Sequence, residues 1–171
     1  AALDAVRYKM FYDAEERVRT EAIRTIVALD RAGSWEALRE RLADSRAPTN
    51  DRATVATELV KHHSADDITA LSEVLAEEWE TDDSPLIHAI GRAISRHAER
   101  QHRPLVQTLL GHENGIIQIY AVRAIGKAGL VDLAQEVVPI AEAEADSPLR
   151  RAARSALDTT GVEYSTDSGE E

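Results

Sequence analysis

The stretch "GKAG" at residues 126–129 is the part of the chain that most suggests phosphate chemistry. A phosphate-binding loop needs a Ser or Thr directly after its Gly-Lys pair, and it lies where a strand leads into a helix. Ala128 takes that place here, and the stretch follows a helical pattern. We therefore predict that Gly126 and Gly129 form the end of a helix and the turn after it.

The stretch "GHEN" at residues 111–114 contains a His-Glu pair, His112 and Glu113, of a kind that ligates metals. The pair is similar to the dyads of a HEAT-like di-iron hydroxylase, an enzyme that requires four of them, whereas this chain has one. No other pair of histidines has the three- or four-residue spacing, with a carboxylate between, that metal ligands on a helix show. We expect solvated or capping histidines and no metal site.

Carboxylates are abundant, but no pair of them stands out as a general acid and a general base. The densest run, "AEEWETDDS" at residues 76–84, comes just before a predicted helix start. We expect a solvated loop whose acids favour the positive end of the next helix, and a cation site is the alternative. The sequence therefore predicts no enzyme, no catalytic residue and no cofactor.

The composition of the 171-residue chain favours helices packed on helices. Hydrophobic residues make up 43% of the chain, but aromatic residues only 4%, so the core must consist of small and aliphatic side chains. The absence of cysteine excludes disulfides and thiolate metal sites. Since no apolar run approaches the roughly 18 residues that cross a bilayer, we expect a soluble, cytoplasmic protein without a membrane partner.

The net charge of −11 argues against a nucleic-acid partner, because a duplex-binding surface needs Lys and Arg to replace counterions. Lys9, Lys61 and Lys127 are the only lysines, and the other basic residues are arginines. An acidic surface with little lysine is expected of a protein from a salt-rich, halophilic cytoplasm, where carboxylates keep the surface hydrated. On this interpretation the excess of acidic residues is an adaptation to a salt-rich solvent and does not indicate a cationic partner.

One sequence segment recurs along the chain with the same apolar spacing. "SPLIHAIGRAI" at 84–94 returns as "SPLRRAARSAL" at 147–157, and the same apolar spacing starts again at Val18, Asp51 and Ile117, so the copies are 31 to 35 residues apart. This period is typical of solenoid repeats. Each copy has the apolar stripe of an amphipathic helix. The predicted helix-start signals are Asp13, Thr49 or Asn50, Ser84 before Pro85, and Ser147 before Pro148.

A second amphipathic pattern lies between the copies, so each repeat is predicted to be a helical hairpin. Neither helix of a hairpin can bury its apolar face alone, and stacking the hairpins buries both. The second helices are expected at residues 34–44, 65–80, 103–111 and 130–145.

The repeat "ADSPLRRAARSALDTTG" at 145–161 resembles the HEAT-like repeat of phycobilisome lyases, whose pattern has an Asp, a Val-Arg pair and an Ala-rich turn. The stretches at 13–26 and 121–129 match parts of the same pattern. The arginine of the Val-Arg pair is present as Arg19, Arg52 and Arg150, but Ile87 and Gln118 replace it in the two central copies. The Arg ladder that often ties such repeats together is therefore interrupted.

This resemblance implies an all-α fold, a right-handed α-α superhelix or solenoid of about five HEAT-like helical hairpin repeats. We expect a single repeat domain over residues 1–161, whose first helix, 2–12, caps the array or ends a preceding repeat. Residues 162–171 are expected to form an acidic, disordered tail.

The family contains chromophore lyases and assembly scaffolds, so the fold does not decide the function. In this architecture the second helices usually line the concave face, where a partner binds. Of the two tryptophans on these helices, Trp35 is expected to fill a gap between repeats, whereas Trp79 is a candidate contact. The predicted partner-binding residues are Arg39, Glu73, Trp79, Gln107 and Gln135.

The function predicted from these features is a non-enzymatic protein-protein interaction scaffold that binds a partner protein or peptide on its concave helical face. The alternative is a lyase or chaperone for a bilin-type chromophore, whose propionates require arginines such as Arg39 and Arg41. A DNA-repair glycosylase of HEAT-like fold is a third class, which the net charge opposes.

Overall fold

The computed structural model describes residues 1–166, and all the regular structure in this range is helical, which confirms the all-α prediction. The chain divides into two compact units, Ala1–Ile90 and the residues from Gly91 onward. The boundary falls inside α6 (Pro85–His97).

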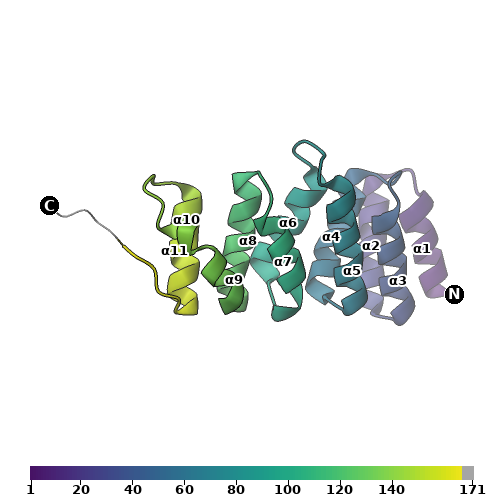
Figure 1. Ribbon diagram of the computed structural model, residues 1–171. Helices are drawn as coiled ribbons and strands as arrows, with labels where there is room; N and C mark the ends of the chain where they lie inside the picture. The colour runs from purple at the N-terminus through teal and green to yellow at the C-terminus, as the bar shows by residue number, and fades with distance from the viewer. Residues whose placement is uncertain (167–171) are drawn as a thin grey trace. The chain divides into compact units, whose positions relative to one another are not determined.

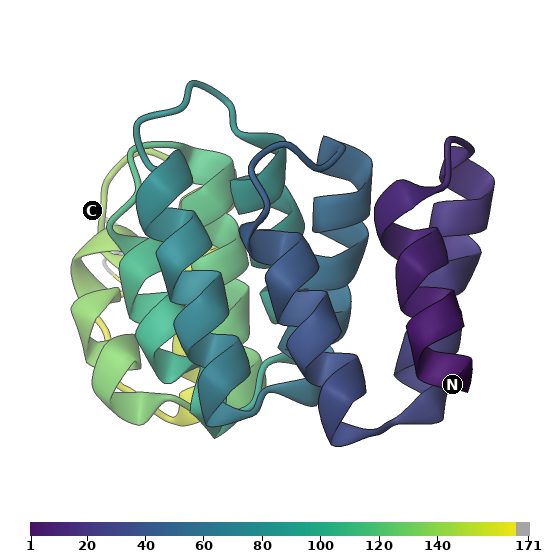
Figure 2. The ribbon, with the colours of Figure 1, turned by 90° about the vertical axis from the view of Figure 1, so that its right-hand side faces the viewer.

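The first unit contains five complete helices in two layers: α2 packs against α4, and α3 packs against both α4 and α5 (Figure 1). Helix α1 lies beside α2 and also contacts α3 (Figure 2). These helices are α1 (Ala2–Tyr12), α2 (Glu16–Leu29), α3 (Ala32–Ala43), α4 (Thr49–His62) and α5 (Ala65–Glu78).

The second unit is centred on α8, which packs against α7, α9 and α11. The helix predicted at 130–145 is interrupted after Glu136, since Pro139 has no backbone N–H to continue the α-helical hydrogen bonds. The elements after α6 are η1 (Arg100–His102), α7 (Arg103–Leu110), α8 (Gly115–Ala128), α9 (Val131–Glu136), α10 (Val138–Ala141) and α11 (Pro148–Thr160).

The structure confirms that the two Ser-Pro pairs mark helix N-termini. The Ser147 hydroxyl accepts a hydrogen bond from the Arg150 N–H (3.0 Å), and Ser84 accepts one from the Ile87 N–H (3.4 Å). The helix start predicted at Thr49 or Asn50 is observed, since α4 begins at Thr49, but the capping residue is Pro48 rather than either of these two. A fixed φ near −65° suits proline to this position.

Small residues allow α8 and α11 to approach closely. Ala121, Ala153 and Ala156 on these two helices are buried, whereas Ala89 on α6 is only half-buried. Gly129 follows the end of α8 in the left-handed conformation (φ 64°), which confirms its role in the turn. Gly126, however, lies inside α8, where an added Cβ would stand 3.3 Å from the Ala156 Cα. Its small size serves helix packing rather than the turn.

The described part of the predicted tail, residues 162–166, forms no helix. The Tyr164 hydroxyl donates to Asp158 (3.0 Å), and the Ser165 N–H donates to Glu142 (2.8 Å). The remaining tail residues, 167–171, lie outside the described residues. Across residues 1–166, no helix combines the length and the apolar character required to cross a membrane.

Candidate functional site

Several arginines of the first unit form internal ion pairs that link its helices. The Asp51 side chain on α4 is fully buried and accepts hydrogen bonds from Arg19 Nε on α2 (2.7 Å) and Arg41 Nη2 on α3 (2.6 Å). Arg52 Nε donates to the Leu42 carbonyl (2.8 Å). The Val-Arg positions of this unit therefore connect neighbouring helices, and Arg41 is too buried to contact a ligand.

A second buried carboxylate, Asp67, lies in the first turn of α5. Its Oδ1 accepts a hydrogen bond from Arg39 Nη1 (2.7 Å), and its Oδ2 accepts one from the Ser64 N–H (3.0 Å) and also faces His62 Nδ1. Burial opposes ionisation of Asp67, but the hydrogen bonds from Arg39, His62 and Ser64 outweigh it and hold the pKa of Asp67 below its usual value. The positive charge of Arg39 is therefore neutralised within the fold.

Trp35 covers this cluster instead of extending a binding surface. Its ring stacks on the His62 imidazole, with centroids 3.6 Å apart and planes within 8°, and its Nε1 donates to Asp30 (2.9 Å). The half-buried Trp35 thus packs between the first and second hairpins, in agreement with the prediction that it fills a gap between repeats.

An open groove of about 720 Å³ lies between α3 and α5, and half of its lining residues are carboxylates. Ala43, Ala70 and Val74 contribute apolar surface to the groove, and Arg39 and Thr69 also line it. We call this feature the acidic groove, and its carboxylates are Glu36, Glu40, Asp66, Glu73 and Glu77.

Two of these carboxylates have basic partners and three do not. Glu40 pairs with Arg7, and Glu77 lies 3.8 Å from Arg52. Within residues 1–166, no Lys, Arg or His forms an ion pair with the other three. The three exposed, unneutralised carboxylates are Glu36, Asp66 and Glu73. Such a surface attracts cationic groups and repels anionic ones.

The structure brings together two of the five predicted partner-binding residues. Arg39 and Glu73 line the acidic groove. Trp79 follows the end of α5, is half-buried and is not among the groove residues. Gln107 on α7 and Gln135 on α9 are exposed in the second unit, and the Gln107 side chain accepts a hydrogen bond from Arg103 (3.2 Å). A binding role for the latter three residues stays a prediction.

No role was predicted from the sequence for the other carboxylates of the acidic groove, although their spacing indicates that they share helix faces. Glu36 and Glu40 are four residues apart on α3, and Asp66, Glu73 and Glu77 follow one face of α5 at intervals of seven and four residues. What the sequence did not reveal is that these two faces border the same groove.

The residues considered for metal chemistry form hydrogen bonds within loops and at helix starts. His112 lies between α7 and α8, where its Nδ1 accepts a hydrogen bond from the Asn114 N–H (3.0 Å). In the acidic run, Glu78 accepts from the Ser84 hydroxyl (2.8 Å) and Asp83 faces His88 Nε2 at 2.7 Å. Over residues 1–166 no group of three or more His, Asp or Glu side chains has the geometry of a metal site.

Neither a family model nor a curated protein sequence matches the chain. The HEAT-like resemblance therefore stands on the repeated residues of the chain itself.

Proposed function

We propose that the protein is a non-enzymatic interaction scaffold and that the acidic groove binds a basic segment of a partner protein. The observation that carries the proposal is the set of three unneutralised carboxylates, Glu36, Asp66 and Glu73, on two helices that pack against each other. In this proposal the chain is a right-handed solenoid of about five HEAT-like hairpins, and its stacked helices hold the binding surface rigid.

The shape and chemistry of the groove suit the side chains of Lys and Arg. The aliphatic stem of a long basic side chain lies well against Ala43, Ala70 and Val74, while its charged end reaches the carboxylates at the rim. Small-molecule sites, in contrast, are mostly apolar and concave. The groove is therefore better suited to an exposed basic peptide than to a compact ligand.

The same contacts weigh against the bilin alternative. A bilin's propionates need accessible arginines, but Arg39 is bound by the buried Asp67, and Arg41 is bound by the buried Asp51. A groove rich in carboxylates also repels the propionates and the phosphates of nucleic acid.

Fluorescence anisotropy with a labelled Arg- and Lys-rich peptide tests the proposal. The double variant Glu36→Gln/Glu73→Gln removes two of the free carboxylates, and we expect about tenfold weaker binding if each ion pair contributes roughly 0.7 kcal/mol. The matched control is Glu113→Gln/Glu136→Gln, which removes the same charge at exposed positions in the other unit. Equal weakening by the two double variants would show nonspecific attraction to the net charge and would refute the proposal.

A further inference from the structure

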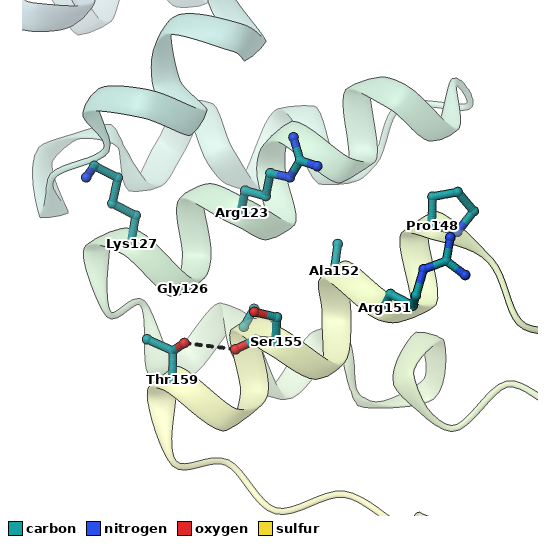
Figure 3. A pocket seen from close by; sticks show the side chains of 9 residues that line it. Arg123, Gly126, Lys127, Pro148, Arg151, Ala152, Ser155 and Thr159 are labelled. Atoms are coloured by element: carbon teal, nitrogen blue, oxygen red, sulfur yellow. Dashed lines mark hydrogen bonds between the residues drawn. The ribbon is translucent and has the colours of Figure 1, made fainter.

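The second unit carries a surface of the opposite sign, although the chain as a whole is strongly acidic. Neither α6 nor α8 contains an Asp or a Glu. Between α8 and α11 lies an open groove of about 550 Å³, shown in Figure 3. We call it the basic groove, and its lining residues are Arg123, Gly126, Lys127, Pro148, Arg151, Ala152, Ser155, Ala156 and Thr159.

The repeat register shows how this surface differs from the first unit. The repeats starting at Val18 and Ile117 place Arg24 and Arg123 at equivalent positions, and those starting at Asp51 and Ile117 do the same for Lys61 and Lys127. In the first unit each cation has a glutamate three residues earlier as an ion-pair partner: Glu21 lies 3.4 Å from Arg24, and Glu58 lies 3.1 Å from Lys61.

In the basic groove these glutamates are replaced by uncharged residues. Tyr120 and Ala124 precede Arg123 and Lys127 by three residues. Both cations are exposed, and no carboxylate in the described part of the chain forms an ion pair with either of them. Arg123 and Lys127 are thus available to an external anion.

The third cation of the groove is only loosely held. Arg151 pairs with Asp146 at 2.7 Å, but the two side chains are 61% and 66% exposed. Ion pairs this exposed contribute little and exchange readily with a competing carboxylate. Arg151 therefore adds to the positive potential of the groove.

The three cations are distributed along the groove rather than gathered at one point. Figure 3 shows Lys127 toward one end and Arg151 toward the other, with Arg123 between them. Between the cations the groove is lined by the small residues Gly126, Ala152 and Ala156, which provide an apolar surface. This arrangement matches a ligand with several separated negative charges and an apolar body.

We infer that the basic groove binds an acidic segment of a partner protein, through carboxylates that pair with Arg123, Lys127 and Arg151. A protein segment provides both the separated charges and the apolar contacts that this lining requires. Nucleic acid is disfavoured because a duplex binder typically makes about 6–10 phosphate contacts, whereas this groove offers three cations on a chain of net charge −11. The inference is independent of the acidic groove and gives the protein a second docking surface of opposite sign.

The test is anisotropy of the full chain with a labelled Glu- and Leu-rich peptide in low-salt buffer. We expect saturable binding and about tenfold weaker binding for the double variant Arg123→Gln/Lys127→Gln. The matched control, Arg24→Gln/Lys61→Gln, removes the same charge at the equivalent repeat positions, which do not line the basic groove, and should leave the affinity unchanged. A peptide with Gln in place of Glu should not bind, and this measurement does not depend on any variant.

Three results would overturn the inference. The first is no binding of the Glu-rich peptide, and the second is equal weakening by the two double variants. The third is tighter binding of a labelled single-stranded oligonucleotide, or complete displacement of the peptide by millimolar inorganic phosphate, since either identifies a phosphate site instead. Circular dichroism of each variant verifies that the helices are retained.

Discussion

Replacing Asp51 with alanine is predicted to destabilise the first unit strongly. The change leaves two arginines without their carboxylate, and they are not equally affected. Arg19 keeps its bonds to the Asp13 and Ala14 carbonyls (both 3.0 Å), whereas Arg41 keeps no hydrogen bond of this kind and retains Asp44 at 4.0 Å and the Phe11 ring, 5.3 Å from its Cζ. The Arg41 side chain is 4% exposed, so most of the cost is the burial of its unpaired charge.

Removing one partner of a buried ion pair costs about 3–5 kcal/mol. A protein of this size loses about 2–4 °C of Tm per kcal/mol, so we expect Asp51→Ala to lower Tm by roughly 6–20 °C. Urea unfolding followed by tryptophan fluorescence suits the measurement, because both tryptophans, Trp35 and Trp79, lie in the first unit.

Two further variants distinguish this mechanism from a general loss of charge. Glu36→Ala removes an exposed carboxylate and should change the free energy of unfolding by no more than about 0.5 kcal/mol. The double variant Asp51→Ala/Arg41→Met removes the unpaired cation as well, so it should be more stable than Asp51→Ala alone. If Asp51→Ala unfolds at the same urea concentration as the parent, the buried ion pairs do not stabilise the fold and the reasoning is wrong.

Two other stability predictions concern packing and pH. Ala153→Leu adds carbon atoms to the fully buried core of the second unit, so we expect the free energy of unfolding measured in urea to fall by about 1–3 kcal/mol. If the urea midpoint equals that of the parent, the space beside α11 accommodates the larger side chain and the packing argument is wrong. The pKa of Asp67 in the folded state lies below its ordinary value of 3.8. The ionised Asp67 therefore stabilises the folded protein fully above pH 3.8, and this stabilisation is lost as the pH falls through the folded-state pKa. Asp67→Asn should therefore be less stable at neutral pH and lose less stability on acidification, and parallel pH profiles would contradict the assignment.

Much of the helical architecture could be predicted from the sequence, because the signals involved are local. The apolar spacing placed second helices at 65–80 and 103–111, close to the observed α5 and α7, and the Ser-Pro pairs located the starts of α6 and α11. A proline within a predicted helix was the main signal overlooked, and it accounts for the break between α9 and α10.

Only the tertiary structure determines which charged side chains have an ion-pair partner and which do not. Arg39 and Arg123 are both arginines on amphipathic helices, but Arg39 meets Asp67, 28 residues away in sequence, whereas no carboxylate of residues 1–166 pairs with Arg123. The two grooves likewise arise where helices from successive repeats pack side by side. Periodicity within a helix determines which face is polar, but neutralisation depends on distances between helices, and these exist only once the chain has folded.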